Sequence, residues 1–142
     1  MASCSDYFRS MFTNGMKECQ QAEIELKGVS ALGLEKVIEI IYTSNTQFDS
    51  NEALFECIAA ANHMQCLLAV DVCEKNFVSR VTCHNFNYFI QMAKLYRLRN
   101  ALKQIDAFIL NNLTDIILNM NTLTKQQKRF QQKLVSHSFL FI

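Results

Sequence analysis

The chain has three histidines and six cysteines that could supply an acid–base group, a nucleophile or metal ligands. The histidines are far apart in the sequence, at His63, His84 and His137. Cys83 and His84 are adjacent, but neighbouring helical residues point about 100° apart and cannot face each other as nucleophile and base. The cysteines also lack the C-x-x-C pairs typical of zinc sites. The sequence therefore predicts a protein that is not an enzyme and has no catalytic residues, cofactor or metal.

The cysteines are expected to be reduced thiols, several of them on apolar helix faces. The first residues, MASCSDYF, lack the basic and apolar parts of a secretory signal, and no apolar run approaches the roughly 18 residues of a membrane span. We therefore expect a cytoplasmic or nuclear protein. The six cysteines are Cys4, Cys19, Cys57, Cys66, Cys73 and Cys83.

A different kind of chemistry is suggested by the tripeptide Leu54-Phe55-Glu56. Helical spacing turns Leu54 and Ile58 toward a core and leaves Phe55 and Glu56 facing water. An exposed aromatic side chain beside a carboxylate could anchor a binding partner. The alternative is a helix with one stray phenylalanine, and spacing alone leaves both interpretations open.

These residues must be positioned by the surrounding elements, of which Glu23 to Ser44 shows the clearest pattern. In Glu23–Lys27, Ile24 and Leu26 alternate with charged residues, which predicts a short strand. Gly28 breaks this alternation and Ser30 can cap a following helix. The inward positions of that helix are predicted to be Leu34, Val37, Ile38, Ile41 and Tyr42.

Most of the remaining chain is predicted to be helical, since it contains no proline and only three glycines. Three further amphipathic helices are predicted before residue 82, and the first two have a serine cap. The first is Ser3–Thr13, with Ser5 as cap and with Phe8, Met11 and Phe12 facing inward. The second is Ser50–Met64, with Ser50 as cap and with Leu54, Cys57, Ile58 and Ala61 facing inward. The third is Leu67–Val81, whose inward residues are Leu67, Val70, Cys73, Phe77 and Val81 and whose outward residues are Asp71, Glu74 and Lys75.

The charge is unevenly distributed along the chain. Residues 1–118 carry a net charge of −3 and residues 119–142 carry +4. The basic run KQQKRFQQK at 125–133 could bind nucleic acid or an acidic membrane. Without interleaved aromatic residues, such a run is more often a solvated tail, so neither nucleic acid nor membrane is expected as a partner.

Several ordered motifs resemble one known family. The run S-D-Y-F-R-S-M-F-T, then EIELKGVS, a helix ending I-I-Y-T-S, and A-A-A-N-H-M resemble the second half of a BTB (POZ) domain of the kelch-like proteins. The segments N-F-N-Y-F-I-Q-M-A-K-L-Y-R-L and D-A-F-I-L-N-N-L are similar to the first helix pair of the BACK domain, called the 3-box. The resemblance covers about residues 2–118 and lacks the family's opening strands.

The resemblance implies a mainly α-helical fold with one short residual strand. Its expected domains are a partial BTB/POZ domain at 1–80, a partial BACK domain at 81–118 and an unrelated basic and apolar tail at 119–142. The three scattered glycines do not match the paired glycines that mark each blade of a kelch propeller.

The resemblance also implies a function, that of a non-catalytic adaptor for a cullin-3 ubiquitin ligase. The cullin-binding residues implied by position are Met11, Glu18, Leu54, Phe55 and Glu56, and the 3-box groove residues are Phe86, Phe89, Ile90, Leu98, Leu102 and Ile105. From the residues alone, Met11 could equally be core and Glu18 a solvated charge. A second apolar stripe on the first 3-box helix, formed by Tyr88, Met92 and Leu95, could instead indicate a fully buried central helix.

Self-association is the remaining expectation from the family. Kelch-like BTB domains dimerise through parts that precede S-D-Y-F, so Ala2, Tyr7 and Phe8 on the dimer side are expected to be partly exposed. We expect weak or heterogeneous self-association. The alternative functions are a BTB dimerisation module that interferes with full-length kelch-like proteins, and a non-functional truncated isoform.

Overall fold

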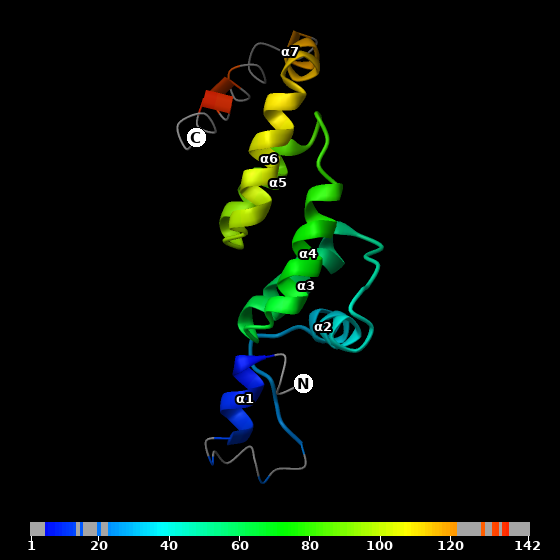
Figure 1. Cartoon of the computed structure of the whole chain (residues 1–142), viewed down its shortest axis with the longest axis vertical. Helices are drawn as coiled ribbons and strands as arrows, with labels where there is room; N and C mark the ends of the chain where they lie inside the picture. The colour runs from blue at the N-terminus through cyan, green and yellow to red at the C-terminus, as the bar shows by residue number, and fades with distance from the viewer. Residues whose placement is uncertain are drawn as a thin grey trace. The chain divides into compact units, whose positions relative to one another are not determined.

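The computed structural model describes residues 5–13, 15, 20, 23–121, 129, 132–133 and 135–136. The chain divides into two compact units, Met1–Asn76 and Phe77–Ile142. The described residues form a mainly α-helical structure, as the sequence predicts (Figure 1). Its helices are α1 Asp6–Thr13, α2 Ala31–Thr43, α3 Asn51–His63, α4 Leu67–Ser79, α5 Phe86–Leu95, α6 Arg99–Asn111 and α7 Leu113–Asn121.

The strand predicted at Glu23–Lys27 does not form, and no strand occurs among the described residues. A strand needs a neighbouring strand to satisfy its backbone N–H and C=O groups, and no described segment pairs with this one. The predicted alternation is nevertheless present, because Ile24 and Leu26 are half-buried between exposed charged residues. The segment ends in a turn at Gly28, whose φ of 78° lies in the left-handed region that favours glycine.

The three predicted serine caps are confirmed. The hydroxyl oxygens of Ser30 and Ser50 accept hydrogen bonds from the backbone N–H groups of Gly33 and Ala53, at 3.0 and 3.1 Å. Ser5 caps α1 with a longer bond of 3.4 Å from the N–H of Phe8. Each serine thereby satisfies one of the backbone donors that a helix start leaves without an intrahelical partner.

In the first unit, α2 packs closely on α3. A Cβ atom added to Gly33 would lie 2.4 Å from the backbone oxygen of Glu56 and 3.0 Å from the Cβ of Ala60. Gly33 therefore brings the two helix backbones together, and Val37 and Ile40 of α2 are fully buried.

One residue predicted to face inward is exposed in each of α1 and α2. Tyr42 is 76% exposed while Ile40, which the prediction omitted, is buried, because the close approach at Gly33 turns the Gly33, Val37 and Ile40 side of α2 toward α3. Phe12 is 45% exposed because the short α1 buries only its Phe8 and Met11 side.

The inward stripe predicted for α3 is confirmed, while that of α4 needs two corrections. Leu54, Cys57, Ile58 and Ala61 of α3 are all fully buried. In α4, Leu67 is 77% exposed because it is the first residue of the helix and lies beyond the covered part of the stripe.

The second correction to α4 concerns Glu74, which is buried although it was predicted to be outward. Glu74 follows Val70 by four residues and precedes Phe77 by three, so helical geometry places it on their side. The inward residues Cys73, Phe77 and Val81 are buried as predicted, and Val70 is half-buried.

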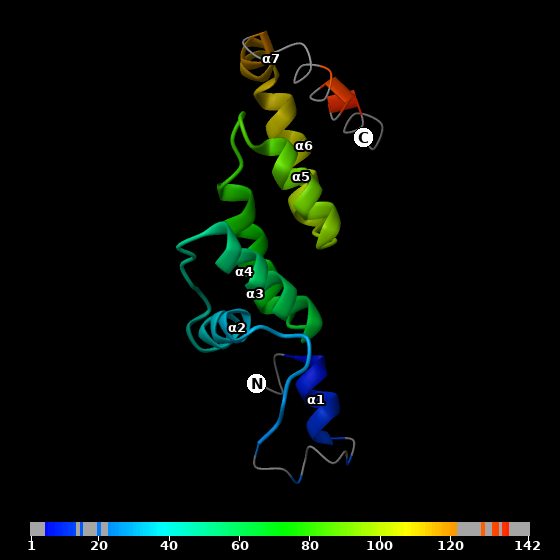
Figure 2. The ribbon, with the colours of Figure 1, turned by 180° about the vertical axis from the view of Figure 1, so that it is seen from behind.

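In the second unit, α5 and α6 lie side by side (Figures 1 and 2). The predicted stripe of Phe86, Phe89, Ile90 and Ala93 is buried. The rings of Phe89 and Phe77 pack edge to face, with their centroids 4.8 Å apart. The opposite stripe is not covered, since Tyr88 is 46% and Leu95 is 68% exposed. The interpretation of α5 as a fully buried central helix is therefore wrong.

Helices α3 and α5 end in the same hydrogen-bonded arrangement. The N–H of Leu98 donates to the carbonyl of Ala93 at 2.8 Å and that of Arg97 to Lys94 at 3.2 Å. At the end of α3, Cys66 donates to Ala61 at 2.9 Å and Gln65 to Asn62 at 3.2 Å. This is the Schellman motif, and the residues in its left-handed position are Arg97 and Gln65, with φ of 57° and 49°.

Candidate protein-interaction surfaces

The residues with metal or acid–base chemistry are not gathered into a site. The described part of the chain contains no group of three or more His, Cys, Asp or Glu side chains that could hold a metal. The His63 ring lies against the Tyr7 ring, with centroids 5.6 Å apart. Cys83 and His84 lie in the turn before α5, and His137 is outside the described residues.

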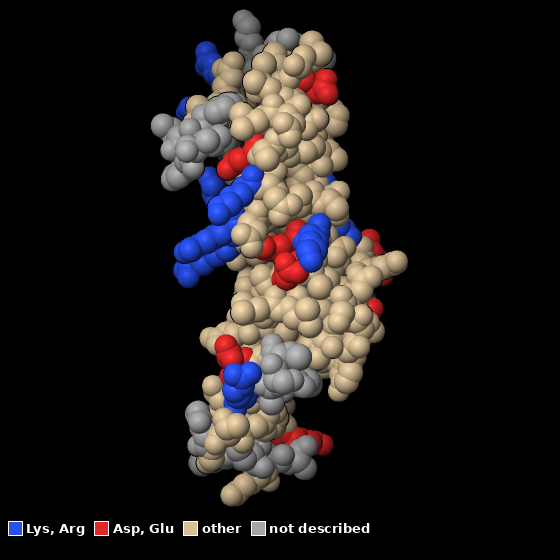
Figure 3. Space-filling model, in the orientation of Figure 1, with Lys and Arg blue, Asp and Glu red and all other residues tan. Residues whose placement is uncertain are grey.

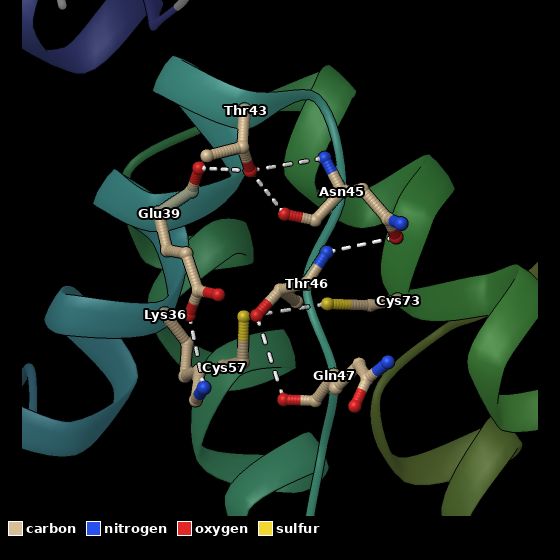
Figure 4. A network of polar contacts seen from close by, with 8 residues as sticks. All are labelled: Lys36, Glu39, Thr43, Asn45, Thr46, Gln47, Cys57 and Cys73. Atoms are coloured by element: carbon tan, nitrogen blue, oxygen red, sulfur yellow. Dashed lines mark hydrogen bonds and ion pairs between the residues drawn. The ribbon is translucent and has the colours of Figure 1, made fainter.

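Four cysteines are free thiols, and two of them touch. The Sγ atoms of Cys57 on α3 and Cys73 on α4 are 3.4 Å apart (Figure 4). The hydrogen bond to Cys57, followed by burial, raises the pKa of the Cys73 thiol. A thiol held in its protonated form is a poor nucleophile, so this pair is a packing contact. Cys4 and Cys19 are outside the described residues.

A polar network fixes the connection between α2 and α3 (Figure 4). Lys36 donates to the Glu39 carboxylate at 2.9 Å, and this hydrogen bond lowers the pKa of Glu39. At the end of α2, the Thr43 hydroxyl donates to the carbonyl of Glu39 at 2.7 Å, and the N–H of Thr46 donates to Asn45 Oδ1 at 2.8 Å. These bonds connect backbone and neighbouring side chains, and they provide no paired acid and base.

The residues matched to a cullin contact occupy different environments. Glu56 is exposed, as predicted, whereas Met11 and Leu54 are buried and Glu18 is outside the described residues. Phe55 was predicted to face water, but it is only 8% exposed. The prediction failed because α3 is covered over more than half of its circumference rather than along one stripe.

The exposed part of α3 is consequently a narrow strip, which we define as Glu52, Glu56, Ala59 and His63, and Asn62 is exposed beside it at the helix end. The residues of the strip recur at four, three and four positions, so they share one side of the helix. The hydroxyl of Ser5 donates to the backbone oxygen of Met64, which attaches the start of α1 to the end of α3. The structure thus presents Glu56 on a helix that is packed on its remaining sides.

Most of the six residues matched to the 3-box groove are buried in the core of the second unit and do not form an open surface. Phe86, Phe89 and Ile90 of α5 are buried. Leu98 and Ile105 are also buried, and Leu102 is half-buried. The other side of α5 has the exposed Tyr88 and Leu95 with the half-buried Met92 between them, and we call these three residues the outer face.

Residues expected on the dimer side are only partly accessible. Tyr7 is half-exposed, as predicted, and Ala2 is outside the described residues. Phe8 is buried, contrary to the prediction, because it lies with Met11 on the covered side of α1. The centroid of its ring is 5.5 Å from that of Tyr7 and 6.2 Å from that of Phe12.

Four exposed basic residues near the turn between α5 and α6 were not singled out from the sequence. They are Lys94, Arg97, Arg99 and Lys103. The signal was present, since residues 77–121 contain five basic and two acidic residues. The net charge of −3 over residues 1–118 masks this excess, because eleven of the thirteen acidic residues lie in residues 1–76. No described helix is both long and apolar enough to cross a membrane.

Comparisons with known proteins agree with the sequence motifs. The BTB/POZ domain model matches residues 1–81. Kelch-like protein 13 from Mus musculus is 36% identical over 138 residues, which are 97% of this chain and 21% of that protein. Kelch-like protein 26 from Homo sapiens is 40% identical over 119 residues, and Kelch-like protein 36 from Rattus norvegicus is 35% identical over 116; each match covers 82% of this chain and 19% of the relative. The chain spans about a fifth of the length of these relatives. It therefore belongs to the BTB/POZ domain family, with the kelch-like proteins as its relatives.

Proposed function

We propose that this chain is a non-catalytic adaptor that binds the N-terminal region of cullin-3 in a ubiquitin ligase. Membership of the BTB/POZ family supports a protein-interaction module. The further step to cullin-3 rests on the resemblance to kelch-like proteins in the residues of α1, α3 and the α5–α6 pair. The domain division proposed with it is a partial BTB/POZ domain at 1–80, a partial BACK domain at 81–118 and a tail at 119–142.

The observation that favours a contact on α3 is its narrow exposed strip. A helix packed on most of its sides loses little conformational freedom when a partner binds the remaining side. Glu56 offers a carboxylate at the middle of that strip and is the residue we assign to direct contact. Met11, Leu54 and Phe55 are buried, so their assigned role is to hold α3 in position.

The matched residues of α5 and α6 have a similar supporting role in this proposal. Phe86, Phe89, Ile90, Leu98 and Ile105 keep the two helices packed. Leu102, which is half-buried, is the member of this set able to touch a partner directly.

Isothermal titration of the whole chain with the N-terminal region of cullin-3 tests the proposal. We expect Glu56→Ala to weaken binding about tenfold, the effect of losing one charged contact at an interface centre. Glu35→Ala is the matched control, because Glu35 is also an exposed helical glutamate but lies on α2. If the folded wild-type chain does not bind cullin-3, or if both variants bind as the wild type does, the proposal is wrong.

A further inference from the structure

Exposed basic side chains surround the turn between α5 and α6. Lys94 lies in the last turn of α5, Arg97 in the connection, and Arg99 and Lys103 at the start of α6. Arg99 and Lys103 are four residues apart and therefore share one side of α6. Figure 3 shows Lys and Arg side chains gathered beside this helix pair. We call these four residues the basic corner.

An exposed apolar surface adjoins the basic corner. Tyr88, Met92 and Leu95 of the outer face recur at four and three positions, so they form one stripe along α5. Leu95 is the most exposed of them and directly follows Lys94 in the chain. An isolated exposed leucine needs no explanation, but a continuous apolar stripe that ends at a cluster of like charges is typical of an interaction surface.

Basic residues outnumber acidic residues in the helices around the basic corner, since residues 77–121 contain five basic side chains. Residues 77–121 contain only two acidic side chains, Asp106 and Asp115. Burial raises the pKa of Asp106, and the charge of nearby Lys94 opposes this shift.

Arg97 occupies a backbone position where local folding would favour glycine. Its φ of 57° is left-handed, and a side chain there meets a steric penalty that glycine avoids. The hydrogen bonds that end α5 come from backbone groups and do not need the guanidinium. The side chain of Arg97 is therefore available for a role in recognition.

We propose that the basic corner and the outer face of α5 together bind an acidic peptide segment of a partner protein, one whose carboxylates flank apolar side chains. Carboxylates would pair with the basic corner while the apolar side chains cover Leu95, Met92 and Tyr88. A nucleic-acid backbone would use the charges but leave this apolar stripe uncovered. This site shares no residue with the α3 strip assigned to cullin-3, and its test does not involve cullin.

Fluorescence anisotropy with two labelled peptides provides the test. One peptide repeats Glu-Glu-Leu, and its control has Gln in place of every Glu. The whole chain should bind the Glu peptide at least about fivefold more tightly than the Gln peptide, and added salt should reduce that preference. Equal affinity for the two peptides would overturn the proposal.

Matched variants then locate the binding site. Arg97→Gly should weaken binding of the Glu peptide about two- to fivefold without loss of folding, the effect of one exposed charge. Gln65→Gly is its control, because Gln65 has the same backbone conformation and no charge. The double variant R99E/K103E should weaken binding further, whereas Lys27→Glu, an exposed charge reversal in the first unit, should not.

Leu95→Ser tests the apolar part and should also weaken binding. Unchanged affinity in Arg97→Gly and R99E/K103E would contradict the role of the basic corner, and unchanged affinity in Leu95→Ser would contradict that of the outer face. Tighter binding to an oligothymidylate or to phosphatidylserine vesicles than to the Glu peptide would also overturn the proposal, in favour of nucleic acid or membrane.

Discussion

Two neighbouring residues of α3 should respond differently to truncation. Phe55 is buried, so Phe55→Ala should lower the free energy of unfolding by about 3–5 kcal/mol through lost burial and the cavity left behind. Glu56 is exposed, so Glu56→Ala should change it by less than about 0.5 kcal/mol. Urea unfolding of the two variants measures both values. A small effect of Phe55→Ala would mean that the ring is not part of the core.

The Cys57–Cys73 contact predicts how stability depends on pH. Because the pKa of Cys73 is raised in the folded chain, its thiol stays protonated above about pH 8.5, where the unfolded thiol ionises. The folded state then binds more protons than the unfolded state, so the free energy of unfolding should fall as the pH rises above about 8.5. Below that pH the Cys73 thiol is protonated in both states, so it should not change the free energy of unfolding as the pH varies.

Urea unfolding between neutral and alkaline pH checks this prediction, with Cys73→Ala as the control. The variant should lose the part of the decline that Cys73 causes, which is at most about 1.4 kcal/mol per pH unit. If the wild type and the variant show the same decline, the contact does not suppress ionisation of Cys73.

Gly33 should be a sensitive position because its missing side chain lets α2 approach α3. An added Cβ would meet the backbone oxygen of Glu56 at 2.4 Å, and a backbone atom cannot rotate away. Gly33→Ala should therefore destabilise the fold by about 1–3 kcal/mol through overpacking, less the roughly 1 kcal/mol that alanine gains in a helix. Thermal unfolding measures the net loss, and Glu35→Ala on the exposed side of α2 should show none.

The ends of α3 and α5 allow a prediction about backbone strain. Arg97→Gly removes a steric penalty of about 1 kcal/mol but makes the unfolded chain more flexible, so stability should be unchanged or slightly higher. Tyr96→Gly, one residue earlier with an ordinary φ of −88°, should instead lose at least about 1 kcal/mol, because glycine is more flexible and the half-buried ring is removed. Chemical unfolding of both distinguishes the positions, and equal losses would contradict the strain argument.

The helices and their caps could be predicted because their signals are local. Ser30 and Ser50 each satisfy a backbone group three residues away, and the buried stripes of α3 and α5 follow from helical spacing. Burial of Phe55 and exposure of Tyr42 could not be predicted in this way, since they depend on which neighbouring helix covers each side. The prediction of a strand at Glu23–Lys27 was wrong for the same reason, because a strand forms only where a second strand pairs with it.

The candidate surfaces were predictable to a similar extent. Exposure of Glu56 follows from its place on α3, whereas the groove residues matched by resemblance proved to be largely core. The basic corner depends on the turn between α5 and α6, which brings residues from two helices together. Spacing within a single helix contains no information about that arrangement.

The two compact units of the chain have net charges of opposite sign. Met1–Asn76 contains five basic and eleven acidic residues, a net charge of −6, and Phe77–Ile142 contains nine basic and two acidic residues, a net charge of +7. The net charge of +1 and the pI near 7.6 therefore come from cancellation between two strongly charged parts.

This cancellation has a practical consequence for handling the protein. Near its pI the chain has almost no net charge to keep molecules apart, yet acidic and basic parts of different molecules attract one another. Dissolved salt screens that attraction within a Debye length of about 10 Å at 0.1 M. The protein should therefore salt in, so that moderate sodium chloride redissolves chains that precipitate in dilute buffer.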